Sequence, residues 1–249
     1  MDRIVLDQNV GIGKEVGIEG PPLEALRFQG ARVGSIVTLT DSRGNDFRGR
    51  VRSLSEKGAS ILVFEAFPSS TESSVEIILL QALPEKERME LIIQKATELG
   101  VSGIVPFKSE RSISLEERDA KQRKSLRWQE IAVKAVQQSR RAKIPQVEPC
   151  RSFQEVLEGC IEEGLRILLW EKEGEPLKKI LRHHSPKKIY AIVGPEGGFT
   201  EEEVKLAKNK GFIPIKLGQR ILRTETAAIA LIGILQYELG DLNLSSPGS

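Results

Sequence analysis

The chain has 249 residues, of which 39% are hydrophobic and 29% charged, and a formal net charge of +2. This composition is ordinary for a soluble globular protein, and the length allows two domains or one large α/β domain. The longest apolar segment, residues 227–235, is too short to span a membrane. The charges near the N-terminus lie where a signal peptide needs an apolar core. We therefore expect a cytoplasmic protein.

Metal and disulfide chemistry have few candidate residues in this chain. Its only cysteines and histidines are Cys150, Cys160, His183 and His184. A zinc site needs about four nitrogen or sulfur ligands, and two isolated thiols do not make a disulfide scaffold. We expect buried, inert thiols and no bound metal.

Residues 1–70 consist of short β-rich segments separated by turns. Strands are predicted over residues 35–39, 46–51 and 59–64, with Gly, Asp and Asn in the turns between them. This pattern indicates a small β-barrel domain. The polar run at residues 68–74 is typical of a linker between domains.

From residue 75 onward, strands and helices alternate. Strands are predicted at residues 76–83, 104–107, 165–170, 188–193 and 212–217. Helices are predicted at residues 85–99, 153–161, 175–184, 200–211 and 224–239, with a basic helical stretch ending near residue 143. Such alternation predicts an α/β domain with a mainly parallel sheet over residues 75–242, followed by a loose tail at 243–249.

Two glycine-containing segments follow predicted strands near the C-terminus. They are residues 194–200, with the sequence GPEGGFT, and residues 217–228, with the sequence LGQRILRTETAA. Open α/β sheets bind ligands at the carboxyl ends of their strands, and glycine lets a backbone approach a ligand closely. A tight turn that needs glycine for its dihedral angles explains the first segment equally well. Neither a P-loop nor a dinucleotide fingerprint is present, and Glu196 inside the loop disfavours a phosphate ligand.

A basic strip extends from residue 118 to residue 143, with nine Lys or Arg residues against two acids. Such a strip can hold a phosphate backbone even when the whole chain is nearly neutral. A solvated helix face is the other explanation, and it is the usual one for a charge run. Trp128 in this strip could stack on a base, although a helical Trp is more often a core or dimer contact.

The two glycine-containing segments together resemble the SPOUT methyltransferases, and within them the ribosomal RNA small subunit methyltransferase E (RsmE) family. Further motifs occur in the same order: KATELGV at 95–101, SERS at 109–112 and QQSRRAKIP at 137–145. The resemblance covers roughly residues 75 to 240. The family's His-containing segment before the first barrel strand has only Leu26 and Arg27 as its counterpart here.

The resemblance implies an enzyme that transfers a methyl group from S-adenosylmethionine (SAM) to N3 of a uridine in 16S ribosomal RNA of the small subunit. It also implies a C-terminal trefoil knot, an N-terminal PUA-like β-barrel that binds RNA, and a homodimer. No membrane and no metal would be involved.

Carried onto this chain, the resemblance implies a set of cofactor residues, and the chemistry of the reaction and the placing of the motifs suggest catalytic and RNA-binding residues. The cofactor would be bound by Leu169, Trp170, Glu171, Gly194, Pro195, Glu196, Gly197, Gly198, Leu217, Gly218, Ile221 and Leu222. Catalysis would rest on Arg223, which stabilises the uracil anion or anchors RNA, with Glu225 to orient it and Glu196 as a weaker candidate for the general base. RNA would be contacted by Arg27, Arg111, Arg140, Arg141 and Arg223. A surface Arg223 that merely pairs with Glu225 is the simpler alternative.

Two other functions remain open from the sequence. One is a non-catalytic RNA-binding or ribosome-assembly module on the same fold, which the intact cofactor loops argue against. The other is a nucleotide-dependent oxidoreductase, which lacks its fingerprint here.

Overall fold

The computed structural model describes residues 3–42, 45–67, 72–112, 118–139, 141 and 143–243. The chain divides into two compact units, residues 1–71 and 72–249. The predicted loose tail, beyond residue 243, lies outside the described residues, as do positions 68–71 of the predicted linker.

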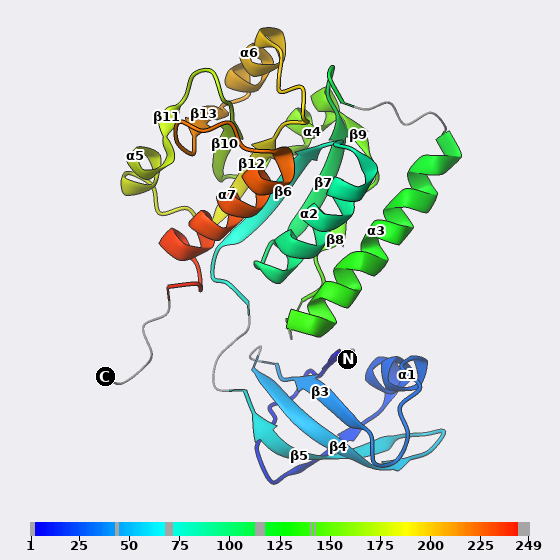
Figure 1. Ribbon diagram of the computed structural model, residues 1–249. Helices are drawn as coiled ribbons and strands as arrows, with labels where there is room; N and C mark the ends of the chain where they lie inside the picture. Colours follow the sequence, from blue (N-terminus) through cyan, green and yellow to red (C-terminus); the bar gives the residue numbers. More distant parts are fainter. Residues whose placement is uncertain are drawn as a thin grey trace. The chain divides into compact units, whose positions relative to one another are not determined.

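In its described residues, the first unit is a curled five-stranded sheet with one helix (Figure 1). Across the sheet the strands are β1 (Arg3–Val5), β3 (Ile36–Thr40), β4 (Asp46–Leu54), β5 (Ala59–Ala66) and β2 (Glu15–Ile18). The pairs among β3, β4, β5 and β2 are antiparallel, and β1 joins β3 in parallel. The three predicted strands are confirmed as β3, β4 and β5.

Helix α1 (Gly20–Phe28) was not predicted. A proline lies in its first turn, where the missing N–H costs no helical hydrogen bond. Leu23 and Leu26 are buried on its inner side and attach the helix to the core of the sheet.

The second unit contains a parallel eight-stranded sheet, as predicted. Its strands in order are β11 (Glu175–Pro176), β13 (Ile213–Lys216), β10 (Leu165–Leu169), β12 (Lys188–Val193), β6 (Glu76–Ala82), β7 (Gly103–Lys108) and β8 (Gln146–Val147), and β9 (Arg151–Ser152) pairs with β7. The pairings are parallel throughout this sheet's described strands. Pairing of residues 175–176 with β13 is the reason that the next helix starts two residues later than predicted.

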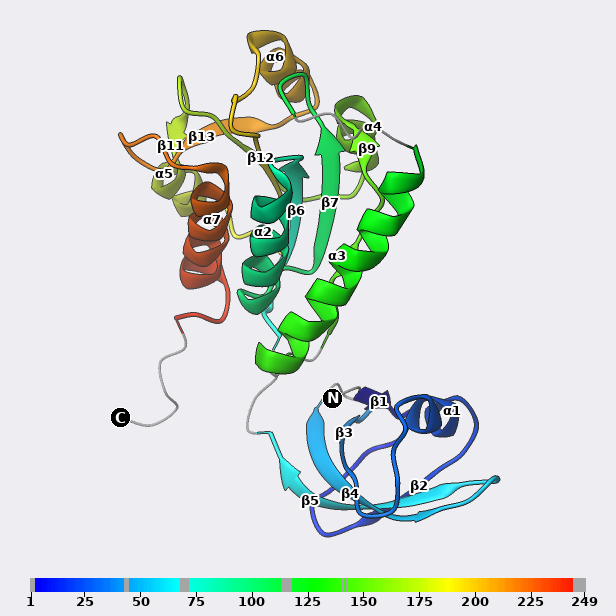
Figure 2. The same cartoon turned by 45° about the vertical axis from the view of Figure 1, so that its right-hand side comes forward.

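Helices cover both faces of this sheet (Figures 1 and 2). On one face lie α2 (Lys86–Glu98), α3 (Arg118–Ser139), α5 (Leu177–Arg182) and α7 (Thr224–Leu239). On the other lie α4 (Phe153–Gly159) and α6 (Glu201–Asn209). The predicted capping box at α6 is confirmed: the Thr200 hydroxyl accepts the N–H of Glu203, and the Glu203 carboxylate accepts the N–H of Thr200.

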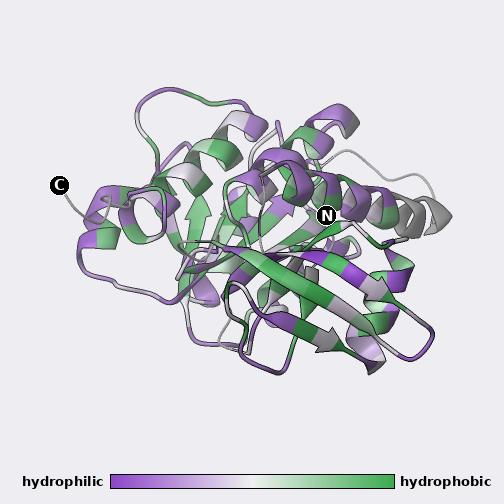
Figure 3. Cartoon of the chain, turned by 90° about the horizontal axis from the view of Figure 1, so that it is seen from below, coloured by the Kyte–Doolittle hydropathy of each residue, from purple (hydrophilic) through white to green (hydrophobic). Residues whose placement is uncertain are grey.

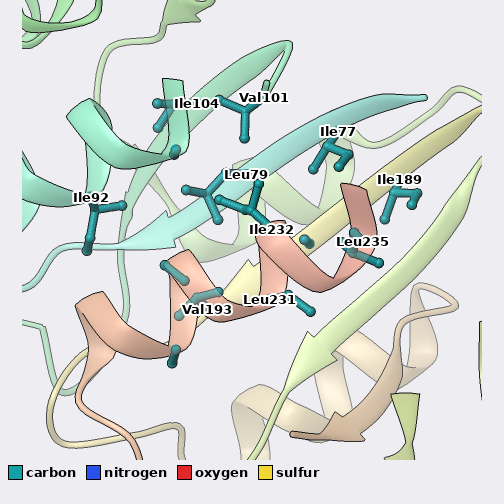
Figure 4. Packing of buried hydrophobic residues seen from close by; sticks show 14 of the residues in the cluster. Ile77, Leu79, Ile92, Val101, Ile104, Ile189, Val193, Leu231, Ile232 and Leu235 are labelled. Atoms are coloured by element: carbon teal, nitrogen blue, oxygen red, sulfur yellow. The ribbon is translucent and has the colours of Figure 1, made fainter. Parts of the chain in front are cut away.

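The larger core lies between the sheet and the first helical layer (Figure 4). Leu231, Ile232 and Leu235 of α7 pack with Ile77 and Leu79 of β6 and with other buried side chains. Hydrophobic residues gather along the strands, and hydrophilic and hydrophobic ones alternate along the helices (Figure 3). Burial on both faces explains why these strands are continuous apolar runs in the sequence.

Strands β13, β10 and β12 are direct neighbours in the sheet. Because they run parallel, the loops that follow them leave the sheet at the same edge. Segments 170–171, 194–200 and 217–223 are therefore brought together, although they lie far apart in the chain.

Candidate active site

A cavity of about 490 Å³ lies at the carboxyl ends of β10, β12 and β13. Its volume falls in the range of small-molecule sites. All twelve residues predicted to bind the cofactor line it, from Leu169 to Leu222. The remaining lining residues are Arg88, Val193, Phe199, Lys216, Gln219, Arg220, Arg223, Thr224 and Ala227.

The loop at residues 194–198 needs glycine for two different reasons. A Cβ on Gly194 would lie 3.0 Å from the ring of Phe199, which is buried and stacked against Phe107 and Phe153. Gly198 has a φ of 67°, a left-handed conformation that other residues adopt at a cost. Close approach and turn geometry thus both apply, and the aromatic stack anchors the end of the loop.

A buried network joins this loop to the start of α7. The Thr224 hydroxyl donates to the carbonyl oxygen of Gly194 at 2.6 Å, and Gln81 Nε2 donates to the Thr224 oxygen at 3.2 Å. Gln81 is fully buried at the end of β6, and its Oε1 has no hydrogen-bond partner in the described part of the chain. The sequence analysis missed Gln81 because nothing in its neighbourhood points to a loop 113 residues away.

Arg88 of α2 also lines the cavity and was missed for the same reason. Its guanidinium contacts the carboxylates of Glu196 at 2.8 Å and of Glu225 at 3.9 Å. The expected partnership of Glu225 with Arg223 is therefore wrong: Glu225 turns toward α2 and does not line the cavity. Burial disfavours the charged form of Arg88, but the hydrogen bond to Glu196 and the surrounding carboxylate charges outweigh it and raise its pKa.

Arg223 lies exposed at the rim of the cavity, at the N-cap position of α7. Among the residues that the structure describes, no carboxylate pairs with its guanidinium. A free cation at the rim is suited to a negative charge on a ligand.

Arg111 lies beside the same cavity. Its Nη1 donates to the carbonyl oxygen of Gly197 at 2.9 Å, and its Cβ would be 3.0 Å from a Cβ on that glycine. The adjacent Glu110 N–H donates to the Glu203 carboxylate at 2.8 Å. The SERS segment is thereby attached to the 194–198 loop and to the start of α6.

The other predicted RNA-binding residues lie elsewhere. Arg27 is exposed in the first unit, where it donates to the carbonyl oxygen of Ser55. Arg140 lies outside the described residues. Arg141 is buried, and it donates to the carbonyl oxygens of Thr97 and Val101 and pairs with Glu72 at 2.6 Å. This burial and these partners are those of a residue that holds the fold, and they disfavour an RNA contact by Arg141.

In the part of the chain that the structure describes, the remaining reactive side chains form no second candidate site. Trp128 is a core residue, 5% exposed. Burial raises the pKa of the Cys160 thiol to about 11, which keeps it protonated and unreactive. Within the described ranges, His, Cys, Asp and Glu side chains form no group that could hold a metal ion, and no helix is long and apolar enough to cross a membrane.

Comparison with known proteins places this geometry in a family. The sequence model of the RNA methyltransferase domain matches residues 71–236. Ribosomal RNA small subunit methyltransferase E of Bacillus subtilis is 32% identical over 212 residues, which are 82% of either chain. Its counterpart in Buchnera aphidicola is 31% identical over 84% of this chain and 82% of its own.

Solved structures agree with the sequence comparison. The crystal structure of ribosomal RNA small subunit methyltransferase E from Neisseria gonorrhoeae, bound to SAM, superposes with a TM-score of 0.74 and 34% identity. The match covers 97% of this chain and 99% of the other. The chain therefore belongs to the ribosomal RNA small subunit methyltransferase E family.

Proposed function

We propose that this protein is a SAM-dependent methyltransferase that acts on ribosomal RNA of the small subunit, at N3 of a uridine. The observation that carries the proposal is the cavity, which gathers the twelve predicted cofactor residues from three strand ends. The SAM-bound relative from Neisseria gonorrhoeae supports the choice of cofactor.

The residues of the cavity fit SAM. Leu169, Leu217 and Leu222 offer apolar surface to an adenine ring, and the glycine loop offers backbone N–H and carbonyl groups to its edge. The carboxylates of Glu171 and Glu196 would attract the positive sulfonium and amino groups of SAM, whereas they would repel a phosphate.

Bound SAM would supply a methyl group that is already activated, so the chain has mainly to position the acceptor nitrogen. The uracil N3 proton must leave, and the resulting anion needs a nearby positive charge. Arg223 is free to provide it from the rim of the cavity. Glu196 is poorly suited to act as the general base, because its carboxylate is paired with Arg88 and its Oε1 also accepts the N–H of Glu85.

RNA contacts are assigned to exposed arginines. Arg111 and Arg223 border the cavity, and Arg27 is exposed in the first unit. Alternate residues of β4 put Arg50 and Arg52 on one exposed side of the first sheet, where they can meet phosphates.

From family membership we also propose four finer features. They are a trefoil knot built from the C-terminal loops, a PUA-like closed barrel in the first unit, a homodimer, and residence in the cytoplasm, where small-subunit RNA is assembled in bacteria.

The test uses methyl-labelled SAM and small ribosomal subunits that lack the modification, followed by digestion and identification of the labelled nucleoside. We expect label in 3-methyluridine. Label in another nucleoside would overturn the uridine N3 assignment. Failure to transfer label with SAM binding intact would point to another RNA target, and failure to bind SAM as well would favour the non-catalytic module.

A further inference from the structure

Arg88 occupies an unusual position in the cavity wall, since it joins three segments through one side chain. Its guanidinium pairs with Glu85, just before its own helix, at 3.3 Å, and with Glu196 at 2.8 Å and Glu225 at 3.9 Å. Glu196 belongs to the 194–198 loop, and Glu225 to the first turn of α7. Both halves of the cavity wall are thus connected to one residue of α2.

Glu196 is held by a second donor from the same helix end. Its Oε1 accepts the backbone N–H of Glu85 at 3.1 Å. Glu85 is the N-cap residue of α2 and makes no capping hydrogen bond with its own side chain. The loop carboxylate therefore caps α2 from outside, where the positive end of the helix dipole also favours it.

Helix α2 is anchored in the main core, so it offers fixed positions for these contacts. Met89, Ile92, Ile93 and Ala96 are at most 1% exposed and belong to the main core. The loop at 194–198, by contrast, is rich in glycine and has no regular secondary structure to define its conformation. Its position relative to the start of α7 therefore depends on side-chain contacts, which are the Thr224–Gly194 hydrogen bond and the pairs that Arg88 makes with Glu196 and Glu225.

We propose that Arg88 is a positioning residue for the cofactor: by pairing with Glu196 and Glu225 it holds the 194–198 loop in place against the start of α7, beside the hydrogen bond from Thr224 to Gly194. This inference rests on the proposed function. It assigns Arg88 no contact with the reacting atoms. The rival role for a cavity arginine, a phosphate contact with RNA, is disfavoured because carboxylates already surround the guanidinium.

The experiment compares Arg88→Ala, Arg88→Lys and Glu196→Gln by calorimetric titration with SAM and by methyl transfer to unmodified subunits. We expect Arg88→Ala to raise the Kd for SAM about tenfold, the effect of losing a charge-assisted hydrogen bond, while the KM for RNA changes little. Arg88→Lys should recover part of the affinity, because an ammonium keeps the charge but cannot reach three carboxylates at once.

The double variant Arg88→Ala/Glu196→Gln separates positioning from general destabilisation. If the two residues act through one contact, the double variant binds SAM about as well as either single variant. Lys95→Ala is the matched control, because Lys95 pairs with Glu98 at 2.8 Å on the same helix and does not line the cavity. It should leave the Kd for SAM unchanged.

Several outcomes would overturn the inference. An unchanged Kd in Arg88→Ala, additive losses in the double variant, or a raised KM for RNA with normal SAM binding would each do so. Failure of the proposed function is distinguishable, since there the unaltered protein itself would neither bind SAM nor transfer its methyl group.

Discussion

Two regions of the second unit use arginine in opposite ways. At the corner formed by Glu72, Thr97 and Val101, the Arg141 guanidinium is buried and donates to two carbonyl oxygens and a carboxylate. At the rim of the cavity, the Arg223 guanidinium is exposed and has no carboxylate partner among the described residues. Both arginines lie in family motifs, so a motif alone does not distinguish an arginine that holds the fold from one that is free to meet a ligand.

The largest expected effect is a loss of stability when the buried Arg141 is replaced. Arg141→Ala should lower the free energy of unfolding by about 3 kcal/mol, because it breaks the buried ion pair with Glu72 and removes the hydrogen bonds to two carbonyl oxygens. Urea denaturation measures this change. Methyl transfer per folded molecule should be nearly unchanged, and a large loss of RNA affinity at full stability would restore Arg141 as an RNA contact.

At the rim of the cavity, removal of the arginine should lower activity and leave stability nearly unchanged. Arg223→Ala should reduce kcat about 100-fold, the typical cost of removing a group that stabilises a developing anion. Its thermal midpoint and its Kd for SAM should stay close to those of the unaltered protein. Single-turnover transfer and calorimetric titration separate the two quantities, and equal losses in both would contradict the assigned role.

A smaller effect is expected in the buried network that joins Gln81, Thr224 and Gly194. Thr224→Val keeps the shape of the side chain but removes the hydroxyl that donates to Gly194, so it should cost about 1 kcal/mol of stability and weaken SAM binding. Thr226→Val is the matched control, since Thr226 is exposed on the same helix. Equal behaviour of the two variants would show that the network does not shape the cavity.

The smallest effect is expected at the exposed arginines of the first unit. Replacing Arg50 and Arg52 by Ala should lower the salt dependence of RNA binding, with a slope reduced by about 0.7 for each lost phosphate contact on single-stranded RNA. Lys57→Ala, in a turn of the same sheet, serves as the comparison. An unaltered slope would mean that this side of the sheet does not meet the RNA backbone.

Local patterns in the sequence were sufficient for most of the second unit. Apolar runs buried on both faces identified its strands, the Thr200 capping box placed the start of α6, and α7 begins and ends where predicted. Helix α1 was not predicted because Gly20 followed by two prolines suggests a turn, and only the packing of Leu23 and Leu26 against the first sheet reveals the helix.

In the site, too, some features were predictable from local sequence patterns and others were not. Its wall was predictable because the wall residues immediately follow strands, and parallel neighbours bring such segments together. The roles of charged residues were not predictable, because Arg88 meets Glu196 from 108 positions away and Arg141 meets Glu72 from 69. Pairing over such distances depends on tertiary packing and leaves no periodicity behind.

The order of the sheet has a consequence for synthesis on the ribosome. Strand β6 is the first strand of the second unit to be made, yet one of its edges is completed only by β12, at Lys188–Val193. Until those residues emerge, an apolar strand has an open edge that can pair with other nascent chains. The first unit, with a core of its own made from residues 4–63, faces no such delay. We expect the methyltransferase unit to be the part of the chain that depends on chaperones.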